Sequence, residues 1–177
     1  TWYHVYAVAD ADATTFTGIC SASASAPTGA SYTYFRYLGS FYNNASGNIA
    51  NFYWFGNGCD ALIMWDIPIS ITTTLSNAVW SGATSCLKAM PATSTIGMFG
   101  LSSINSDQAP NGLWIRPNGS TWNTNVANAN YAYITGAYCG PSSQRICSTD
   151  TSQRIQYQNE NTVDSLEILI EGYYISR

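Results

Sequence analysis

Charged residues are scarce in this chain of 177 residues. Aspartate, glutamate, lysine and arginine make up only 9% of it, with a formal net charge of −4, whereas an average soluble domain carries about 25%. Six basic residues cannot provide the positive surface that nucleic-acid phosphates require, so nucleic acid is excluded as a main ligand. With one lysine and three glutamates, the chain also lacks the composition of a coiled coil or a helical bundle.

Long apolar runs are missing as well. No stretch approaches the roughly 18 consecutive apolar residues of a membrane helix, and no basic segment followed by an apolar one has the form of a signal peptide. We therefore expect no membrane insertion. The chain begins without methionine in a strand-like run at 1–8, which suggests the C-terminal part of a longer protein or a processed product. Its length fits one domain that spans 1–177.

The chain is rich instead in neutral hydrogen-bonding side chains and in aromatic rings. It contains 21 serines, 18 threonines and 15 asparagines, nearly a third of all residues, and 14% of it is aromatic. Disordered chains have few aromatic residues and a high net charge, so this composition predicts a folded protein. Neutral polar side chains must then form the water-exposed surface that charged side chains form in other proteins.

Short runs of β-branched and aromatic residues alternate with turn residues along the whole chain. Eleven such runs predict strands at 2–8, 32–38, 49–55, 59–67, 71–75, 85–90, 95–101, 113–116, 130–138, 153–157 and 166–174. Many short strands at this spacing are typical of a sandwich or a barrel. We therefore predict an all-β fold, an antiparallel β-sandwich of the jelly-roll-like kind in a single domain.

Local signals support the strand prediction. Ile155 and Tyr157 alternate with polar residues, as on a half-buried antiparallel strand. Asn57 and Gly58 tolerate the positive φ angles of a type I′ turn, so we expect a tight hairpin between the runs on either side. The segment 21–27 alternates serine with alanine and is expected to be a connecting loop, with an edge strand as the alternative.

The cysteines are odd in number, so they cannot all pair within the chain: Cys20, Cys59, Cys86, Cys139 and Cys147. A disulfide between Cys139 and Cys147 could close the short loop between them. Alternatively, all five are small buried or half-buried apolar residues of a protein assembled in a reducing cytoplasm, which is the favoured interpretation. Zinc is not expected, because no C-x-x-C pair is present and the one histidine is distant in sequence.

Groups able to perform catalysis are few. His4 is the only histidine and no G-x-S-x-G motif accompanies it, so we interpret it as a strand residue. A glycan-cleaving enzyme needs two carboxylates, and the candidate pairs are Asp10 with Asp12 and Glu167 with Glu171. We expect the first pair to lie in a solvated turn, too sparse to bind calcium, and the second on a charged strand face. The prediction is a protein that is not an enzyme and has no cofactor or metal.

Aromatic residues beside polar turns are the candidates for ligand binding, because sugars stack on aromatic rings while amides and hydroxyls bond to their hydroxyl groups. On this basis Trp80, Trp114, Trp122 and Tyr138 are candidate ligand-binding residues. The alternative for each of them is a place in the core or in a subunit interface, which are also rich in aromatic residues.

Several segments follow one another in a recognisable order. The first third of the chain carries WYHVY at 2–6, APT at 26–28, SYTYFRYLGS at 31–40, SGNIANF at 46–52 and GNG at 56–58, and the end carries TDTSQRIQY at 149–157 and LEILIEGYY at 166–174. This order resembles a block common in virion proteins of tailed bacteriophages. The chain is similar to the C-terminal domain of a virion surface protein of the tail fibre or tail-tip type.

The chain departs from that pattern at two places. Arg36 is followed by Tyr37 and Leu38 where the family has a second arginine and an isoleucine, so no role of a basic pair carries over. The stretch from Cys139 to Cys147 resembles an insertion.

The resemblance implies a virion protein on the tail or capsid surface, commonly homotrimeric. It would serve host attachment, by binding a surface glycan or another receptor, or assembly with other virion proteins. The family brings no shared catalytic residues. The alternatives are a capsid decoration or head-fibre protein, a glycan-cleaving depolymerase domain and a free-standing lectin.

Overall fold

The computed structural model describes residues 1–28, 32–57, 60–72, 80–104, 111–121, 130–134, 138–139, 145–159 and 165–175. These residues form strands and turns, and none of them is helical. Every pairing between the strands is antiparallel. The predicted all-β antiparallel fold is confirmed.

The first sheet, here called the N-terminal sheet, has three strands: β1 (Trp2–Ala9) in the middle, with β2 (Phe16–Ser21) and β3 (Tyr34–Tyr42) at its edges. Alternate residues of β1, His4, Tyr6 and Val8, are buried on one face. The loop after β2 helps to cover this buried face, since the Tyr6 hydroxyl donates to the carbonyl of Ser23 at 2.8 Å. The segment 21–27 is therefore a connecting loop beyond Ser21, as expected.

Two further sheets form a sandwich. The large sheet contains β4 (Phe52–Asn57), β5 (Asp60–Thr72), β13 (Ser165–Ile175) and β7 (Ile96–Ile104) in this order, and then β10 (Tyr138–Cys139) and β11 (Arg145–Ser148), which both pair with the same edge of β7. The small sheet contains, in order, β6 (Thr84–Ser85), β12 (Arg154–Asn159), β8 (Asn111–Pro117) and β9 (Asn130–Ile134).

The connections between these two sheets are those of a jelly roll. After β4 the chain passes from β5 in the large sheet to β6 in the small one, back to β7, and then to β8 and β9. It returns to β10 and β11, crosses to β12 and ends on β13. The order β5-β13-β7-β11 thus belongs to one sheet and β6-β12-β8-β9 to the other, the arrangement of an eight-stranded jelly roll. The predicted jelly-roll-like antiparallel sandwich is confirmed, with β4 as an added hairpin strand.

One hydrophobic core fills the sandwich. The large sheet contributes side chains such as Ile63, Phe99 and Ile170, and the small sheet contributes Ile115 and Ile155, all with no exposed surface. The predicted alternation on β12 is confirmed, because Ile155 and Tyr157 both point into this core. Burial of each such side chain stabilises the fold by roughly 1.5–3 kcal/mol.

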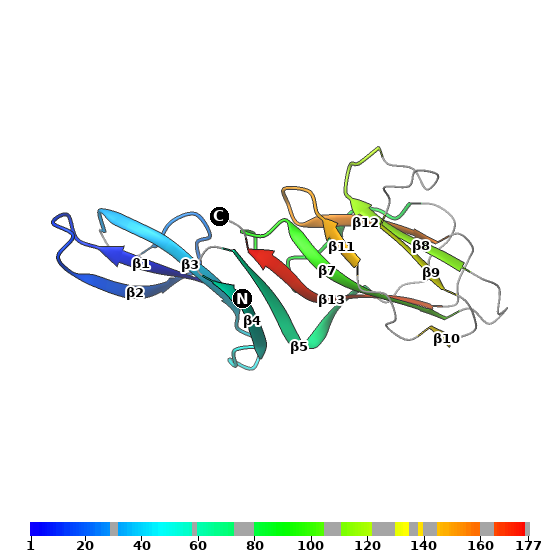
Figure 1. Cartoon of the computed structure of the whole chain (residues 1–177), viewed down its shortest axis with the longest axis horizontal. Coiled ribbons are helices and arrows are strands. Elements are labelled where there is room, and N and C mark those ends of the chain that lie inside the picture. Colours follow the sequence, from blue (N-terminus) through cyan, green and yellow to red (C-terminus); the bar gives the residue numbers. More distant parts are fainter. Residues whose placement is uncertain are drawn as a thin grey trace.

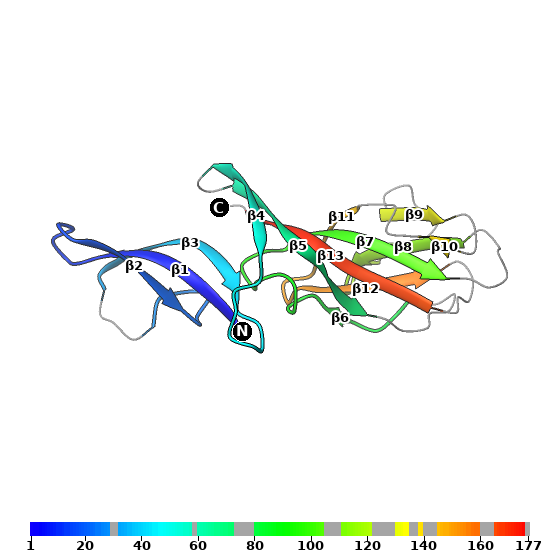
Figure 2. The ribbon, with the colours of Figure 1, turned by 90° about the horizontal axis from the view of Figure 1, so that it is seen from below.

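The N-terminal sheet projects from one end of the sandwich (Figures 1 and 2). The contact between the two is aromatic: the ring of Trp2 lies 5.9 Å from that of Trp65 and 5.8 Å from that of Tyr173, centroid to centroid. The Trp2 indole also donates a 2.7 Å hydrogen bond to the carbonyl of Leu87, beside the sandwich. The first strand is thereby anchored to the core at its beginning.

Some strand predictions differ from the structure. The segment 85–90 is mostly a turn, because the backbone amides of Ala89 and Met90 bond back to the Cys86 carbonyl. The runs 59–67 and 71–75 belong to one long strand, β5, as far as Thr72. The predicted hairpin of β4 and β5 is present, with Asn57 opposite Asp60. The predicted turn residue Gly58 lies outside the described residues. The strands β2 and β11 had not been predicted.

Gly172 lies where β13 shifts register, and a side chain at this position would collide with the carbonyl oxygen of Ile63. We predict that Gly172→Ala lowers the free energy of unfolding by about 1–3 kcal/mol, because overpacking a rigid backbone costs that much. The matched control is Gly18→Ala on β2, where a methyl group meets no atom within 4 Å. Urea unfolding measures both, and equal stabilities of the two variants would contradict the prediction.

Candidate functional site

The outer face of the small sheet carries a cluster of aromatic, amide and guanidinium groups. Along β8, Ile115 points into the core, so Trp114 and Arg116 on either side of it face outward. On β12 their direct partners are Gln158, opposite Trp114, and Gln156, opposite Arg116. All four side chains are half-buried. Strand alternation therefore aligns them in two neighbouring pairs.

Trp80 completes this cluster. The guanidinium carbon of Arg116 lies 3.8 Å from the centroid of the Trp80 ring, a cation–π contact. The Nε of Arg116 donates to the Gln156 amide oxygen at 3.1 Å, and Gln156 donates to the carbonyl of Ser81 at 3.0 Å. Partial burial lowers the pKa of Arg116, yet an arginine stays protonated at neutral pH. We call the five residues the polar aromatic face: Trp80, Trp114, Arg116, Gln156 and Gln158.

The structure brings together two of the four predicted ligand-binding residues, Trp80 and Trp114. Trp122 lies outside the described residues. Tyr138 belongs to β10 in the opposite, large sheet, and its side chain is also outside the described set. Ligand binding by any of the four stays a prediction.

The disulfide considered between Cys139 and Cys147 does not fit the strand register. Both cysteines lie along the same edge of β7, Cys139 opposite Ser103 and Cys147 opposite Gly97. Six strand positions correspond to roughly 20 Å, whereas the Cα atoms of a disulfide are at most about 7 Å apart. The described ends of the stretch that resembled an insertion, β10 and β11, both pair with β7.

The cysteines whose side chains are described are of two kinds. Cys86 and Cys147 are buried, as the favoured interpretation expected, whereas Cys20 is exposed on β2. Burial, with smaller contributions from Cys147 and Asp150, raises the pKa of Cys86 to about 12. The Cys86 thiol is therefore protonated at neutral pH and is a poor nucleophile.

His4 is a buried strand residue, as interpreted from the sequence. Its Nδ1 lies 2.7 Å from the hydroxyl of Ser40 on β3, and that hydroxyl also bonds to Tyr37. Tyr37 bonds in turn to the hydroxyl of Thr93 in the sandwich at 2.9 Å. Burial lowers the pKa of His4, so its imidazole is neutral at pH 7. Since His4 and Ser40 are both at least 96% buried, this chain of hydrogen bonds links sheet to sandwich and offers no access to a substrate.

The two candidate carboxylate pairs lie in different parts of the molecule. Asp10 and Asp12 occupy the turn between β1 and β2, where Asp12 accepts hydrogen bonds from the amide and hydroxyl of Thr14. Glu167 and Glu171 lie on β13. Glu171 is buried against Gly100, and one of its oxygens has no hydrogen-bond partner. The expected charged strand face opposite the apolar residues is therefore wrong for Glu171.

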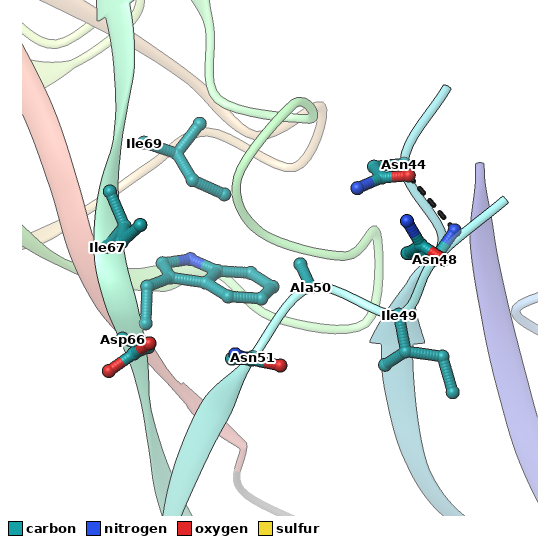
Figure 3. A pocket seen from close by; sticks show the side chains of 9 residues that line it. Asn44, Asn48, Ile49, Ala50, Asn51, Asp66, Ile67 and Ile69 are labelled. Carbon is teal, nitrogen blue, oxygen red and sulfur yellow. Dashed lines mark hydrogen bonds between the residues drawn. The ribbon is translucent and has the colours of Figure 1, made fainter. Parts of the chain in front are cut away.

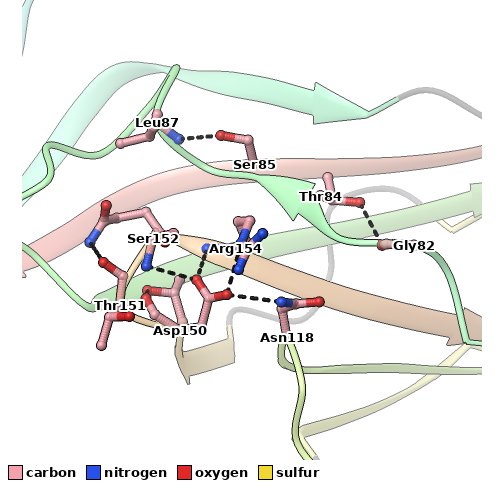
Figure 4. A network of polar contacts seen from close by, with 11 residues as sticks. Gly82, Thr84, Ser85, Leu87, Asn118, Asp150, Thr151, Ser152 and Arg154 are labelled. Carbon is pink, nitrogen blue, oxygen red and sulfur yellow. Dashed lines mark hydrogen bonds and ion pairs between the residues drawn. The ribbon is translucent and has the colours of Figure 1, made fainter.

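The most densely bonded carboxylate, Asp150, ties the turn before β12 together (Figure 4). One oxygen accepts from the backbone amides of Ser152 and Arg154, at 2.9 and 2.8 Å. The other accepts from the Asn118 amide at 2.9 Å and from the Arg154 guanidinium at 2.8 Å. Burial on its own would raise the pKa of Asp150, but these four donors outweigh it and the pKa is lowered. Asp150 is thus engaged in holding the turn.

A hollow of about 360 Å³ lies where the β3–β4 connection meets β5 (Figure 3). Its walls combine three asparagines and an aspartate with three isoleucines, an alanine and one tryptophan: Asn44, Asn48, Asn51, Asp66, Ile49, Ile67, Ile69, Ala50 and Trp65. Its size and mixed lining suit a small polar ligand. The sequence carries no signal for this hollow, because it forms beside the register shift at which β5 leaves its partner β13, between Met64 and Ile69.

The described part of the chain holds neither a metal-ligand cluster nor a membrane-spanning helix. Its residues contain no group of three or more His, Cys, Asp or Glu side chains that could hold a metal ion. None of its segments forms a helix with the length and apolar character needed to cross a bilayer.

Comparisons with protein-family models, with characterised proteins and with solved structures find no match for this chain.

The network around Asp150 generates a prediction about pH. Because the folded-state pKa of Asp150 lies below its unfolded value of 3.8, its stabilising effect is complete well above pH 4 and is lost as the pH falls through the folded-state pKa. Asp150→Asn should lower the free energy of unfolding at pH 7 by about 1–2 kcal/mol. The loss should be smaller at pH 3.

Urea unfolding of the wild type and the variant at both pH values measures this difference. Asp10→Asn, in the exposed turn after β1, is the matched control and should change stability little at either pH. A loss for Asp150→Asn that is equal at pH 7 and pH 3 would refute the assignment of the effect to the ionised carboxylate.

Proposed function

We propose that this chain is a non-enzymatic structural domain on the virion surface of a tailed bacteriophage, of the tail fibre or tail-tip type. It assembles as a homotrimer and attaches the particle to a glycan or another receptor on the host, or serves assembly with other virion proteins. The ordered segments described above support the phage context. The jelly roll is compatible with it, since virus capsid domains and lectins use this fold.

The observation that carries the attachment role is the polar aromatic face. Trp80 and Trp114 offer flat apolar surfaces on which the C–H faces of a sugar ring can stack. Gln158, opposite Trp114, and Gln156, opposite Arg116, offer amide groups. Arg116, which lies over the Trp80 ring, adds a hydrogen-bond donor. Rings that are held in place by strand pairing and by stacking lose little conformational entropy on binding. This combination suits a hydroxyl-rich ligand.

The position of the chain in the particle distinguishes a tail fibre or tail-tip protein from a capsid decoration or head-fibre protein. A tail fibre or tail-tip protein should be labelled at the tail when antibodies to this chain are applied to virions in electron microscopy. Labelling of the capsid would assign it to the alternative class of decoration or head-fibre proteins. Virions that contain none of the chain by mass spectrometry would refute the whole proposal.

The attachment role predicts that the polar aromatic face binds glycan. Trp114→Ala and Trp80→Ala should each weaken binding of the labelled protein to a glycan array and to host cells by about tenfold, which corresponds to roughly 1.4 kcal/mol. Tyr34→Ala, which removes another exposed aromatic ring from β3, is the matched control and should bind as the wild type does.

Thermal unfolding of each variant shows whether the fold is intact. Wild-type protein that binds neither the array nor the host cells, or tryptophan variants that bind unchanged, would contradict attachment through this face. Release of reducing ends from host polysaccharide would instead identify the depolymerase alternative.

A further inference from the structure

The outer face of the large sheet is apolar at the end next to the N-terminal sheet. Antiparallel partners share a face, so the strand registers define rows of side chains that cross the sheet. One outward row runs from β4 to β11 through Tyr53, Met64, Gly172, Met98 and Ile146. The next runs through Phe55, Leu62, Tyr174, Ile96 and Ser148. We call these two rows the apolar face.

An outer face of this kind is unusual for an antiparallel sandwich, in which outward residues are normally polar. Neither row contains a charged residue. The side chains at the two edges of the sheet are the most exposed: Tyr53 at 56% and Phe55 at 54% on β4, and Ile146 at 52% on β11. A mostly apolar hollow of about 400 Å³ interrupts the face, lined by Phe55, Leu62, Ile96 and Tyr174, with Asp60 also in its wall.

The area of the apolar face matches what a subunit contact requires. An aromatic side chain presents about 200 Å², so each half-exposed ring leaves on the order of 100 Å² in water. The two rows together then expose on the order of 500 Å² of apolar surface. A standard interface buries about 800 Å² per partner, of which roughly 65% is apolar in homo-oligomers.

The edge of the large sheet is also unprotected. The last strand, β4, reads FYWFGN and pairs with β5 on one side only. It contains neither lysine nor proline, the residues by which natural edge strands avoid further pairing. Trp54 reaches back to cover Gly39 of β3, whereas Tyr53 and Phe55 point away from the core with no such cover. An edge of this composition is expected to be covered by another chain.

We propose that the apolar face is the contact surface between copies of this chain. This inference rests on the homotrimer of the proposed function and names its interface. A second copy is the occupant because the face has the apolar area of a homo-oligomer contact and its two rows carry no charged side chain, with Asp60 and Asp66 at the flanking positions of β5. Apolar side chains at both edges let β4 of one copy meet β11 at the opposite edge of the next copy. Such head-to-tail contacts can close into a ring. The polar aromatic face, on the opposite sheet, then stays outward.

Molar mass in solution tests the interface. Light scattering after size-exclusion chromatography should give three times the 19.2 kDa of one chain at micromolar concentration. Phe55→Asp and Ile146→Asp, one at each edge of the apolar face, should each reduce the mass to that of a single chain. The matched control is Phe16→Asp, since Phe16 is an aromatic residue exposed at 73% on β2 of the N-terminal sheet. It should leave the assembly unchanged.

A cross-linking measurement does not depend on how well the aspartate variants fold. Phe55→p-benzoylphenylalanine keeps an aromatic ring at the apolar face and should form covalent links between copies on irradiation, whereas the same substitution at Phe16 should form none. A single-chain mass for the wild type would overturn the proposal. So would an assembly that survives both aspartate substitutions and gives no link from position 55.

The test of the interface can fail or succeed independently of the test of the proposed function. Detection of the chain in virions tests the phage role without reference to the interface. An assembly built through another face would refute only the interface, and a single chain found in virions would refute the trimer while leaving the virion role standing.

Discussion

The contact of Trp2, Trp65 and Tyr173 is the interaction on which the rest of the structure depends. The three rings come from β1, β5 and β13, and each centroid lies within 5.9 Å of the other two. This contact fixes the N-terminal sheet at the end of the sandwich. It also fixes β5 where that strand leaves β13, so the hollow beside Trp65 and the apolar residue Met64 next to it depend on the same three rings.

The jelly roll separates two surfaces of opposite character. On β12 and β8 the inward residues are apolar and the outward ones are glutamine, arginine and tryptophan, the usual alternation of a half-exposed sheet. On β13 and β7 both faces are apolar near Tyr173 and Met98. Since the two sheets lie back to back, a partner on the apolar face leaves the polar aromatic face free. One domain could therefore form subunit contacts and bind a ligand without competition between them.

The fold was predictable from the sequence because it depends on local patterns, whereas the site depends on contacts between distant segments. The alternation of Ile155 and Tyr157 with polar residues indicated a strand. The turn residues after Phe55 indicated a hairpin. The sequence could not place Trp80 against Arg116 of β8. Its position depends on Ser81, whose backbone amide donates to the Tyr157 carbonyl and whose hydroxyl accepts from the Tyr157 amide, 76 residues later. The strand β2 was missed because its composition is mixed, with a glycine at its centre and a mostly exposed surface. The apolar turn at 85–90 resembled a strand because it supplies core residues.

Because charged residues are scarce, few ionised groups lose their water when copies of such a domain assemble. For the same reason, an isolated chain is weakly protected against non-specific association. A subunit contact that buries ionised groups must desolvate them, at a cost that pairing does not always recover. The two rows of the apolar face carry no such groups, so their burial costs little beyond the ordering of side chains. An isolated chain with a net charge of −4 and half-exposed rings at Tyr53 and Phe55 has little electrostatic protection against non-specific association. Two half-buried charged residues serve local structure instead: Asp150 holds a turn through four donors, and Arg116 lies against Trp80. The low charge is therefore consistent with a surface divided between copies of the chain and a neutral ligand.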